Sequence, residues 1–379
     1  MPLSTIPLID FYREALCSTE VYVPRSAFTQ MVRLVRLLDK LSREPAYREM
    51  VAPQLLDTAR FDPGHDAVMM CYDFHLAENG PRLIEVNTNA GGGLLAYLAC
   101  HRDCRTLPDQ LAPRLRHRLV ESFAREMALF SKGDSRRPTR IAIVDEAPPG
   151  QHLFGEMQAF AALFEDWGVP TAIVAHEALQ ADSNGVFLDG QRIDLVYNRH
   201  CDFYLEEPAM CGLRQAYLAR EVCLTPNPHA YGLLADKRRL SLWSDPDAMA
   251  TLPLSPRDHA LLRATIPPSL LLDNGNRETL WGERRNLVFK PVDRFGSRGV
   301  LLGEKISRKR FDALPANLTL AQQLIPPSMT DVPGSGPMKT DLRLYAYRNR
   351  PIGLTSRLYR GQVTNLRTPG GGFAPVVLT

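Results

Sequence analysis

The chain has 379 residues, of which 45% are hydrophobic and 23% charged, a composition that excludes a disordered or fibrous protein. Its 45 basic and 42 acidic residues leave a net charge of +3 without long blocks of one sign, so nucleic acid is not an expected partner. No stretch stays apolar long enough to span a bilayer, so no membrane partner is expected. Seven cysteines without a framework spacing favour free thiols and a cytoplasmic location.

The first part of the chain, residues 1–136, is predicted to be mainly helical. Apolar residues recur at helical spacing over residues 26–43, and further helical runs cover residues 45–59 and 113–132. Between them, residues 68–93 have the pattern of two strands and a turn. We therefore expect a helical region that carries one β-hairpin.

The middle of the chain, residues 137–224, is predicted to be a small α/β domain. Short apolar strands are expected at residues 140–144, 171–174 and 193–197, with a helix at residues 153–167. Alternation of strands and helices implies a parallel sheet covered by helices. The glycine-rich fingerprint of dinucleotide-binding folds does not follow the first strand, and no Walker A loop occurs.

The last part, residues 225–379, has a mixed pattern. Strands are expected at residues 287–290, 299–302, 342–347 and 352–359. No segment repeats, so this part is not an array of similar units. We expect an α+β domain that follows the α/β domain.

The segment at residues 68–87 is predicted to form the hairpin, with a turn signal at residues 78–80. With a three-residue loop, Asp73 lies directly opposite Glu85, and Asn87 shares their face because side chains repeat every second residue along a strand. With a two-residue loop the register shifts by one, and the three oxygen-bearing side chains are divided between both faces.

These three side chains are candidate ligands of Mg²⁺. Two carboxylates that face each other on a sheet repel at a cost of up to about 1 kcal/mol, which folding alone gives no reason to accept. Mg²⁺ takes carboxylate and amide oxygens and completes its shell with water and substrate phosphates, so Asp73, Glu85 and Asn87 suit it. By themselves the residues leave an equal alternative, an exposed hairpin whose polar face is merely hydrated.

The hairpin motifs resemble those of a known family. The segments YDFH at residues 72–75 and LIEVN at residues 83–87, followed by TNAGGG at residues 88–93, resemble the metal-binding hairpin of glutathionylspermidine synthetases and related circularly permuted ATP-grasp proteins. In unpermuted relatives such as bacterial glutathione synthetase this hairpin is C-terminal. The resemblance implies a permuted ATP-grasp fold of mixed α/β and α+β class, with a small Rossmann-like domain before its nucleotide-binding part and the remaining ATP motifs downstream.

Those motifs follow in the order that the resemblance implies. Residues 235–240 resemble the first lysine segment of the glutathione synthetase group. Residues 287–291 carry a second lysine inward, and the loop at residues 293–300 has glycines that let backbone amides approach a phosphate. Residues 320–326 resemble the strand that pairs with adenine, and residues 363–372 resemble an asparagine- and glycine-rich lid. The ATP-binding residues implied are Lys237, Lys290, Gly296, Ser297, Gly299, Gln322, Gln323, Leu324, Ile325 and Asn365.

Three arginines are the candidate catalytic residues. Arg298 adds charge to the glycine loop, while Arg343 and Arg357 are expected on neighbouring strands with their side chains directed inward. A guanidinium group matches the planar or tetrahedral oxyanions of a carboxylate and an acyl phosphate, which suits both arginines to the reacting groups. The alternative for these two is a salt bridge to Asp341.

The resemblance implies an ATP- and Mg²⁺-dependent ligase that joins a carboxylate to an amine, or to a thiol, through an acyl phosphate. The substrates would be small molecules or peptides, and the lid would cover about residues 240–320. An ATP-grasp kinase and a non-catalytic nucleotide-binding protein are the alternatives. The amidase domain of the bifunctional spermidine enzymes is not found, so glutathione and spermidine are not implied. Removal of the Asp73 or Glu85 side chain is expected to abolish turnover without unfolding the protein.

Overall fold

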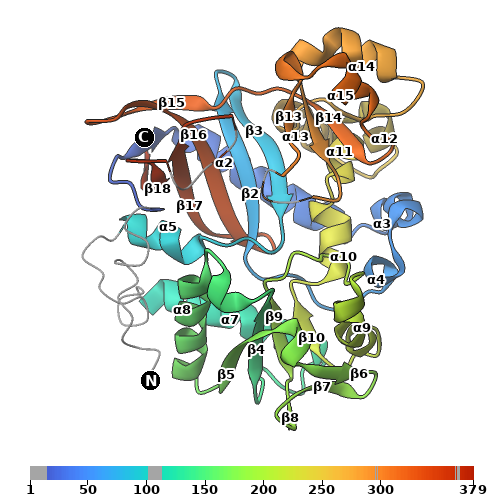
Figure 1. Ribbon diagram of the computed structural model, residues 1–379, viewed down its shortest axis with the longest axis vertical. Coiled ribbons are helices and arrows are strands. Elements are labelled where there is room, and N and C mark those ends of the chain that lie inside the picture. Colours follow the sequence, from blue (N-terminus) through green and yellow to red (C-terminus); the bar gives the residue numbers. More distant parts are fainter. Residues whose placement is uncertain (1–14, 101–112, 295, 297, 363, 365–367) are drawn as a thin grey trace.

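The computed structural model describes residues 15–100, 113–294, 296, 298–362, 364 and 368–379, and its largest sheet has six strands. The sheet joins an early hairpin to late strands in the order β18-β17-β16-β2-β3, and β15 adds to β16. Figure 1 shows the hairpin, in blue, beside the red strands from the end of the chain. These strands are β2 (Met70–Ala77), β3 (Gly80–Asn87), β15 (Ser328–Val332), β16 (Gly336–Tyr347), β17 (Arg350–Tyr359) and β18 (Gly372–Ala374).

One face of this sheet is covered by helix α2 (Arg25–Leu41), which confirms the helix predicted at residues 26–43. Its apolar side chains are buried with those that the strands direct toward it: Met31 and Leu38 belong to the same hydrophobic core as Tyr72 and Leu342. The residues between these on each strand point to the opposite face, because side chains alternate along a strand.

A four-stranded parallel sheet in the order β10-β9-β4-β5 lies beside the first sheet, which confirms the predicted parallel α/β layer. Helices α7 and α8 pack on one of its faces and α9 on the other. The strands are β4 (Ile141–Asp145), β5 (Thr171–Ala175), β9 (Leu195–Asn198) and β10 (Cys223–Thr225). The helices are α7 (Pro113–Phe130), α8 (Phe154–Asp166) and α9 (Cys211–Leu218). A small sheet adds β6 (Gln180–Asp182), β7 (Gly185–Leu188) and β8 (Gln191–Arg192).

A four-stranded antiparallel sheet in the order β11-β14-β12-β13 and several short helices form the remaining layer. The strand predicted at residues 299–302 is shorter than expected. The strands are β11 (Ser269–Leu271), β12 (Leu287–Pro291), β13 (Leu301–Leu302) and β14 (Thr319–Gln323). The helices are α11 (Arg238–Ser244), α12 (Pro246–Ala250), α13 (Pro256–Thr265), α14 (Arg277–Glu283) and α15 (Arg308–Asp312).

The helical run predicted at residues 45–59 is present but interrupted. The segment divides into α3 (Pro45–Val51), a 3-10 turn at Ala52–Gln54 and α4 (Asp57–Arg60). Pro53 lies in the turn and has no backbone N–H to continue the helical bonding. Other elements are β1 (Val21–Val23), which pairs with β19 (Val376–Leu378), α5 (Gly93–Cys100), α10 (Pro228–Ala230) and the π-helical turn η7 (Tyr231–Ala235).

The hairpin has the predicted pairing of Asp73 with Glu85, but its loop length and strand alignment differ from those predicted. Asp73 lies opposite Glu85, as expected. Ala77, however, pairs with Gly80, so the loop has two residues and not three. A bulge at Ile84 inserts one extra residue into β3 and restores the alignment. The expectation that a two-residue loop would divide the polar side chains is therefore wrong, because it assumed an uninterrupted ladder.

Candidate functional site

A cavity of about 540 Å³ lies between the polar face of the six-stranded sheet and the antiparallel sheet. This size is within the range of small-molecule sites in proteins. It brings together most of the predicted site residues: Asp73, Glu85, Asn87, Lys237, Lys290, Gly296, Arg298, Gln322, Gln323, Leu324, Ile325, Arg343 and Arg357. Gly299 does not line it, and Ser297 and Asn365 lie outside the described residues.

Strand alternation and register explain why these side chains meet. On β16, Arg343 lies opposite Asp73 of β2, and Asp341 lies opposite Arg357 of β17. Positions two residues apart on each strand share a face. The early hairpin and the late strands therefore present one continuous charged surface to the cavity.

Asp73 is held by two guanidinium groups. Arg343 donates from Nε and Nη2 to its two carboxylate oxygens at 2.8 and 2.9 Å, and Arg357 Nη2 donates to Oδ2 at 3.2 Å. Arg357 also donates to Asp341 at 2.8 and 2.9 Å, so the salt bridge considered for it is present. Burial alone would raise the pKa of Asp73, but the two guanidinium groups outweigh it and hold that pKa well below its usual range.

The other two candidate metal ligands are also engaged. Asn87 Nδ2 donates to Asp73 Oδ2 at 3.4 Å, and Glu85 Oε1 lies 3.1 Å from Lys237 Nζ. Within the described part of the chain, no group of three or more histidine, cysteine, aspartate or glutamate side chains could hold a metal by itself. The donor chemistry nevertheless fits Mg²⁺, because two carboxylates and an amide lie on one face. A metal would require the arginines and lysine that now neutralise these carboxylates to change partner.

Two lysines approach the same end of the cavity from different elements. Lys237, just after η7, donates to the Arg294 carbonyl at 2.7 Å. Lys290, on β12, donates to the Ile84 carbonyl at 3.0 Å and to Gln322 Oε1 at 2.7 Å. Burial lowers the pKa of Lys290 to about 8, against the opposing effect of the nearby Glu85 carboxylate.

The strand predicted to pair with adenine has some of its polar groups already in use. The Leu324 N–H donates to the backbone carbonyl of Asn286 at 2.8 Å, and the Ile325 carbonyl accepts a hydrogen bond from His75 Nδ1 at 2.6 Å. Gln322 is fully buried, and its Nε2 has no hydrogen-bond partner among the described residues. That amide is one donor available to a ligand at this end.

His75 and Tyr359 line the cavity but were missed from the sequence. His75 could have been found, because it follows Asp73 by two residues and therefore shares its face. Tyr359 stands two residues beyond Arg357 and follows the same rule. The resemblance directed attention to charged residues, so His75 was not selected although it ends the YDFH segment at residues 72–75. Tyr359 belongs to none of the motifs that carry the resemblance.

A second chamber of about 450 Å³ meets the first. Its far side lies at the carboxyl ends of parallel strands β4 and β9, where Asp145, Arg199 and Asp202 line it. Arg199 is buried and donates to the Ala90 carbonyl at 2.8 Å, which gives it a structural role. The two chambers share Glu85, Asn87, Lys237, Gly296, Arg298 and Arg343.

The cysteines at positions 17, 71, 201, 211 and 223 are free thiols, as expected for those that the structure describes. Among the described helices, none combines the length and apolar character needed to cross a membrane.

Comparison with known proteins gives a likeness of fold. No family model matches the sequence, and no curated protein matches it. A glutathione synthetase-like effector of Globodera pallida, in its apo form, is 12% identical, with a TM-score of 0.58 over 100% of this chain and 98% of that one. A putative gamma-glutamylcysteine synthetase of Methylobacillus flagellatus is 13% identical, with a TM-score of 0.50 over 90% and 85%.

A third structure, the ATP-grasp ligase PsnB with a minimal precursor, Mg and ADP, is 16% identical over 64% of this chain and 90% of that one, and its TM-score of 0.33 is too low to support an argument. The resemblance to the glutathione synthetase group is thus confirmed as a likeness of mixed α/β fold. At these identities the likeness carries no information about activity.

Proposed function

We propose that the protein is an ATP- and Mg²⁺-dependent ligase that joins a carboxylate to an amine through an acyl phosphate. The observation that supports this most directly is the meeting of two chambers at one set of charged residues. One chamber is large enough for a nucleotide, and the other opens from the place where its phosphates would lie. A reaction between a nucleotide and a second molecule needs such an arrangement.

In this proposal the fold is a circularly permuted ATP-grasp fold. The early hairpin pairs with β16, and in this pairing Asp73 lies opposite Arg343. The two residues are 270 positions apart in the sequence. A permutation accounts for this order, because the hairpin that is C-terminal in unpermuted relatives then comes first. The division into residues 1–136, 137–224 and 225–379, with a lid at about 240–320, is part of the proposal.

The residues at the shared centre have distinct proposed roles. Asp73, Glu85 and Asn87 would hold Mg²⁺, which when bound neutralises phosphate charge. Lys237 and Lys290 would bind the phosphates, together with Arg298 and the backbone of Gly296, Ser297 and Gly299. Gln322, Gln323, Leu324 and Ile325 would line the adenine end, and Asn365 would lie in the lid.

Arg343 and Arg357 would bind the reacting carboxylate once they release Asp73. A carboxylate brought beside a triphosphate is repelled, and two unit charges at 4 Å cost about 4 kcal/mol in a partly solvated site. Guanidinium groups offset that repulsion and fix the carboxylate for attack.

The reaction would then proceed in two steps. A carboxylate oxygen of the acid attacks the γ-phosphorus, the bond to the β-phosphate oxygen breaks, and ADP and an acyl phosphate form. The amine nitrogen attacks the acyl carbon and loses a proton as inorganic phosphate leaves, which yields the amide. A thiol in place of the amine would yield a thioester. The acid and the amine would be small molecules or peptides.

One observation favours a second candidate, a non-catalytic nucleotide-binding protein. Asp73 has both oxygens in hydrogen bonds with buried guanidinium groups. If those pairs persist when nucleotide binds, no metal can be held there and no phosphate transferred.

The test is incubation of the purified protein with MgATP and a panel of amino acids, peptides and polyamines, with detection by mass spectrometry. A ligase forms ADP, free phosphate and an amide in equal amounts. A kinase leaves phosphate on the acceptor. Nucleotide binding without ADP formation from any combination would reject the ligase and support the non-catalytic candidate.

A further inference from the structure

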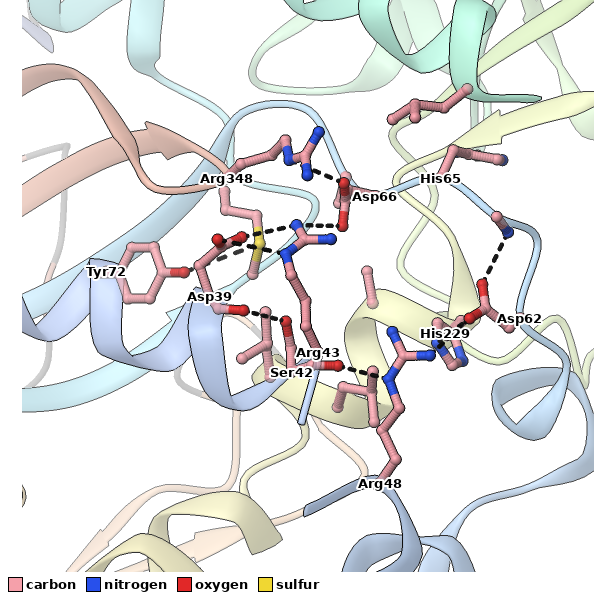
Figure 2. Close-up of a pocket in the computed structure, with 17 residues that line it drawn as sticks. Asp39, Ser42, Arg43, Arg48, Asp62, His65, Asp66, Tyr72, His229 and Arg348 are labelled. Carbon is pink, nitrogen blue, oxygen red and sulfur yellow. Dashed lines mark hydrogen bonds and ion pairs between the residues drawn. The ribbon is translucent and has the colours of Figure 1, made fainter. Parts of the chain in front are cut away.

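A separate cavity, of about 170 Å³, is shown in Figure 2. It lies on the opposite side of strand β2 from the proposed nucleotide site. Met70 and Tyr72 line it, whereas Asp73, the next residue, faces the other way. Its remaining walls come from the end of α2, from α3, the loop before β2, α7, α10 with η7, and the turn between β16 and β17 that carries Arg348. It shares no lining residue with either chamber of the proposed active site, so a function for it is independent of that proposal.

The charges that line this cavity are balanced. Three arginines and three aspartates face it, and they form two groups (Figure 2). The first group contains Arg43 and Arg348 with Asp39 and Asp66, and the second contains Arg48 and Asp62. Each of the three arginines is already paired with at least one aspartate. In the first group, Arg43 Nη2 donates to Asp66 at 2.9 Å, and Arg348 Nε lies 3.2 Å from the same carboxylate.

Each guanidinium nevertheless keeps at least one terminal nitrogen without a hydrogen-bond partner among the described residues. Arg48 uses Nη1 for Asp62 at 2.7 Å and Nε for the Ser42 carbonyl at 2.7 Å. Within the described residues, no hydrogen bond uses Nη2 of Arg48, Nη1 of Arg43 or either Nη of Arg348. These N–H groups can donate to an oxygen-rich ligand without breaking the existing pairs.

Two buried histidines add unused polar atoms. His229 Nδ1 donates to the Ala59 carbonyl at 2.7 Å, so its other nitrogen, Nε2, carries a lone pair in the neutral ring. That Nε2 is buried without a hydrogen-bond partner and lies 3.7 Å from Asp62 Oδ2. His65 Nδ1 pairs with Glu126 at 2.9 Å, and its Nε2 is likewise buried and without a partner. Buried polar atoms that lack partners are costly unless a ligand or water completes them.

We propose that this cavity binds a small zwitterion, an α-amino acid, at a site separate from the proposed active site. The carboxylate would accept from the free Nη groups of Arg43 and Arg348. The ammonium group would donate to His229 Nε2 and to the carboxylate of Asp62, which lie 3.7 Å apart beside Arg48. A ligand without net charge suits a cavity whose own charges cancel, whereas a phosphate dianion would face three aspartates and leave His229 Nε2 without a donor.

The experiment measures binding to the purified full chain by thermal shift and isothermal titration calorimetry. The probes are the twenty amino acids, their carboxamide and N-acetyl derivatives, inorganic phosphate and acetate. At least one amino acid should raise the melting temperature and bind at one site, because a ligand that binds only the folded state stabilises it. Its carboxamide and its N-acetyl derivative should each bind at least tenfold more weakly.

Two matched substitutions locate the site. Arg348→Gln removes a cavity guanidinium, and Arg60→Gln removes a half-exposed one on α4 that does not line the cavity. Arg348→Gln should weaken amino-acid binding at least tenfold, and Arg60→Gln should not change it. The proposal is overturned if no amino acid binds, if phosphate or acetate binds as tightly as the amino acid, or if the two variants bind alike.

Discussion

The two faces of the six-stranded sheet are built from the same strands and differ in almost every respect. Toward α2, Tyr72, Phe74 and Leu342 form part of a continuous apolar core. Toward the proposed nucleotide cavity, the intervening residues Asp73 and Arg343 form a largely buried ion pair. Replacing buried ion pairs by packed apolar side chains is often neutral or stabilising, so folding alone does not require the charged face.

This difference separates the residues that maintain the fold from those that await a ligand. A change of Phe74 or Leu342, which lie on the apolar face and line neither the proposed active site nor the amino-acid cavity, should act on stability alone. A change on the charged face should act on ligand binding and catalysis, and on stability only where it leaves a buried charge without its partner. The following four experiments test that separation.

Glu85→Gln should have the largest effect. Loss of this carboxylate removes one proposed metal ligand and should lower the rate of phosphate release by about 100-fold or more, the range seen when one electrostatic interaction with a transition state is removed. The free energy of unfolding should fall by no more than about 1 kcal/mol, because its partner Lys237 keeps the bond to Arg294.

Glu78→Gln is the matched control, since Glu78 is exposed in the turn of the same hairpin. It should leave the rate of phosphate release unchanged. Wild-type turnover in Glu85→Gln would contradict the assignment of that carboxylate.

Asp73→Asn should affect stability as well as activity, which corrects the expectation that its removal leaves folding intact. The substitution leaves Arg343, whose side chain is only 12% exposed, without its carboxylate. Breaking such a pair costs about 3–5 kcal/mol of unfolding free energy, measurable by urea denaturation. Adding Arg343→Gln to the Asn variant should recover part of the loss. A loss below about 1 kcal/mol for Asp73→Asn would mean that the pair does not form.

Nucleotide affinity should fall above about pH 8 as Lys290, whose pKa burial lowers to about 8, loses its proton. Neutralising this single positive charge predicts up to about a tenfold drop in affinity between pH 8 and pH 9, measurable by calorimetry. The unfolding free energy responds in the opposite direction. Between pH 8 and the ordinary lysine pKa near 10.5, the unfolded chain holds this proton and the folded chain does not, so this group's contribution rises with pH.

Lys290→Arg provides the control for this pH dependence, because a guanidinium group stays charged throughout the range. The affinity of that variant should be flat between pH 8 and pH 9. An equal fall in both proteins would assign the titration to another group.

Gly296→Ala should have only a small effect on stability. Gly296 has φ of +61° with open space around its Cβ position, and Gly334, in the turn before β16, has φ of +74° with the same openness. Alanine at either position costs about 1 kcal/mol of backbone strain. Only Gly296→Ala should also weaken nucleotide binding, because its backbone lines the cavity. Equal affinity in the two variants would remove Gly296 from the site.

Much of this arrangement follows from local sequence. Alternation along residues 72–75 separates Tyr72 from Asp73, and apolar strands that alternate with helices predict the parallel sheet. These features depend on neighbours within a few residues, which is the range over which strand and helix periodicity acts. The breaks at Pro53 and Ile84 show the limit of such reasoning, since a turn or a bulge shifts an element by one residue without altering its overall pattern.

The contacts that define the sites were decided by tertiary structure. Asp73 and Arg343 are 270 residues apart, Lys290 and Ile84 are 206 apart, and His75 reaches the Ile325 carbonyl across 250 residues. The proposed amino-acid cavity likewise depends on tertiary packing, because helix ends pack there against the face of β2 that carries Met70 and Tyr72. The sequence alone determined which side chains share a face. Only packing decided which charges neutralise one another, because ion pairs depend on distance in space and not on separation along the chain.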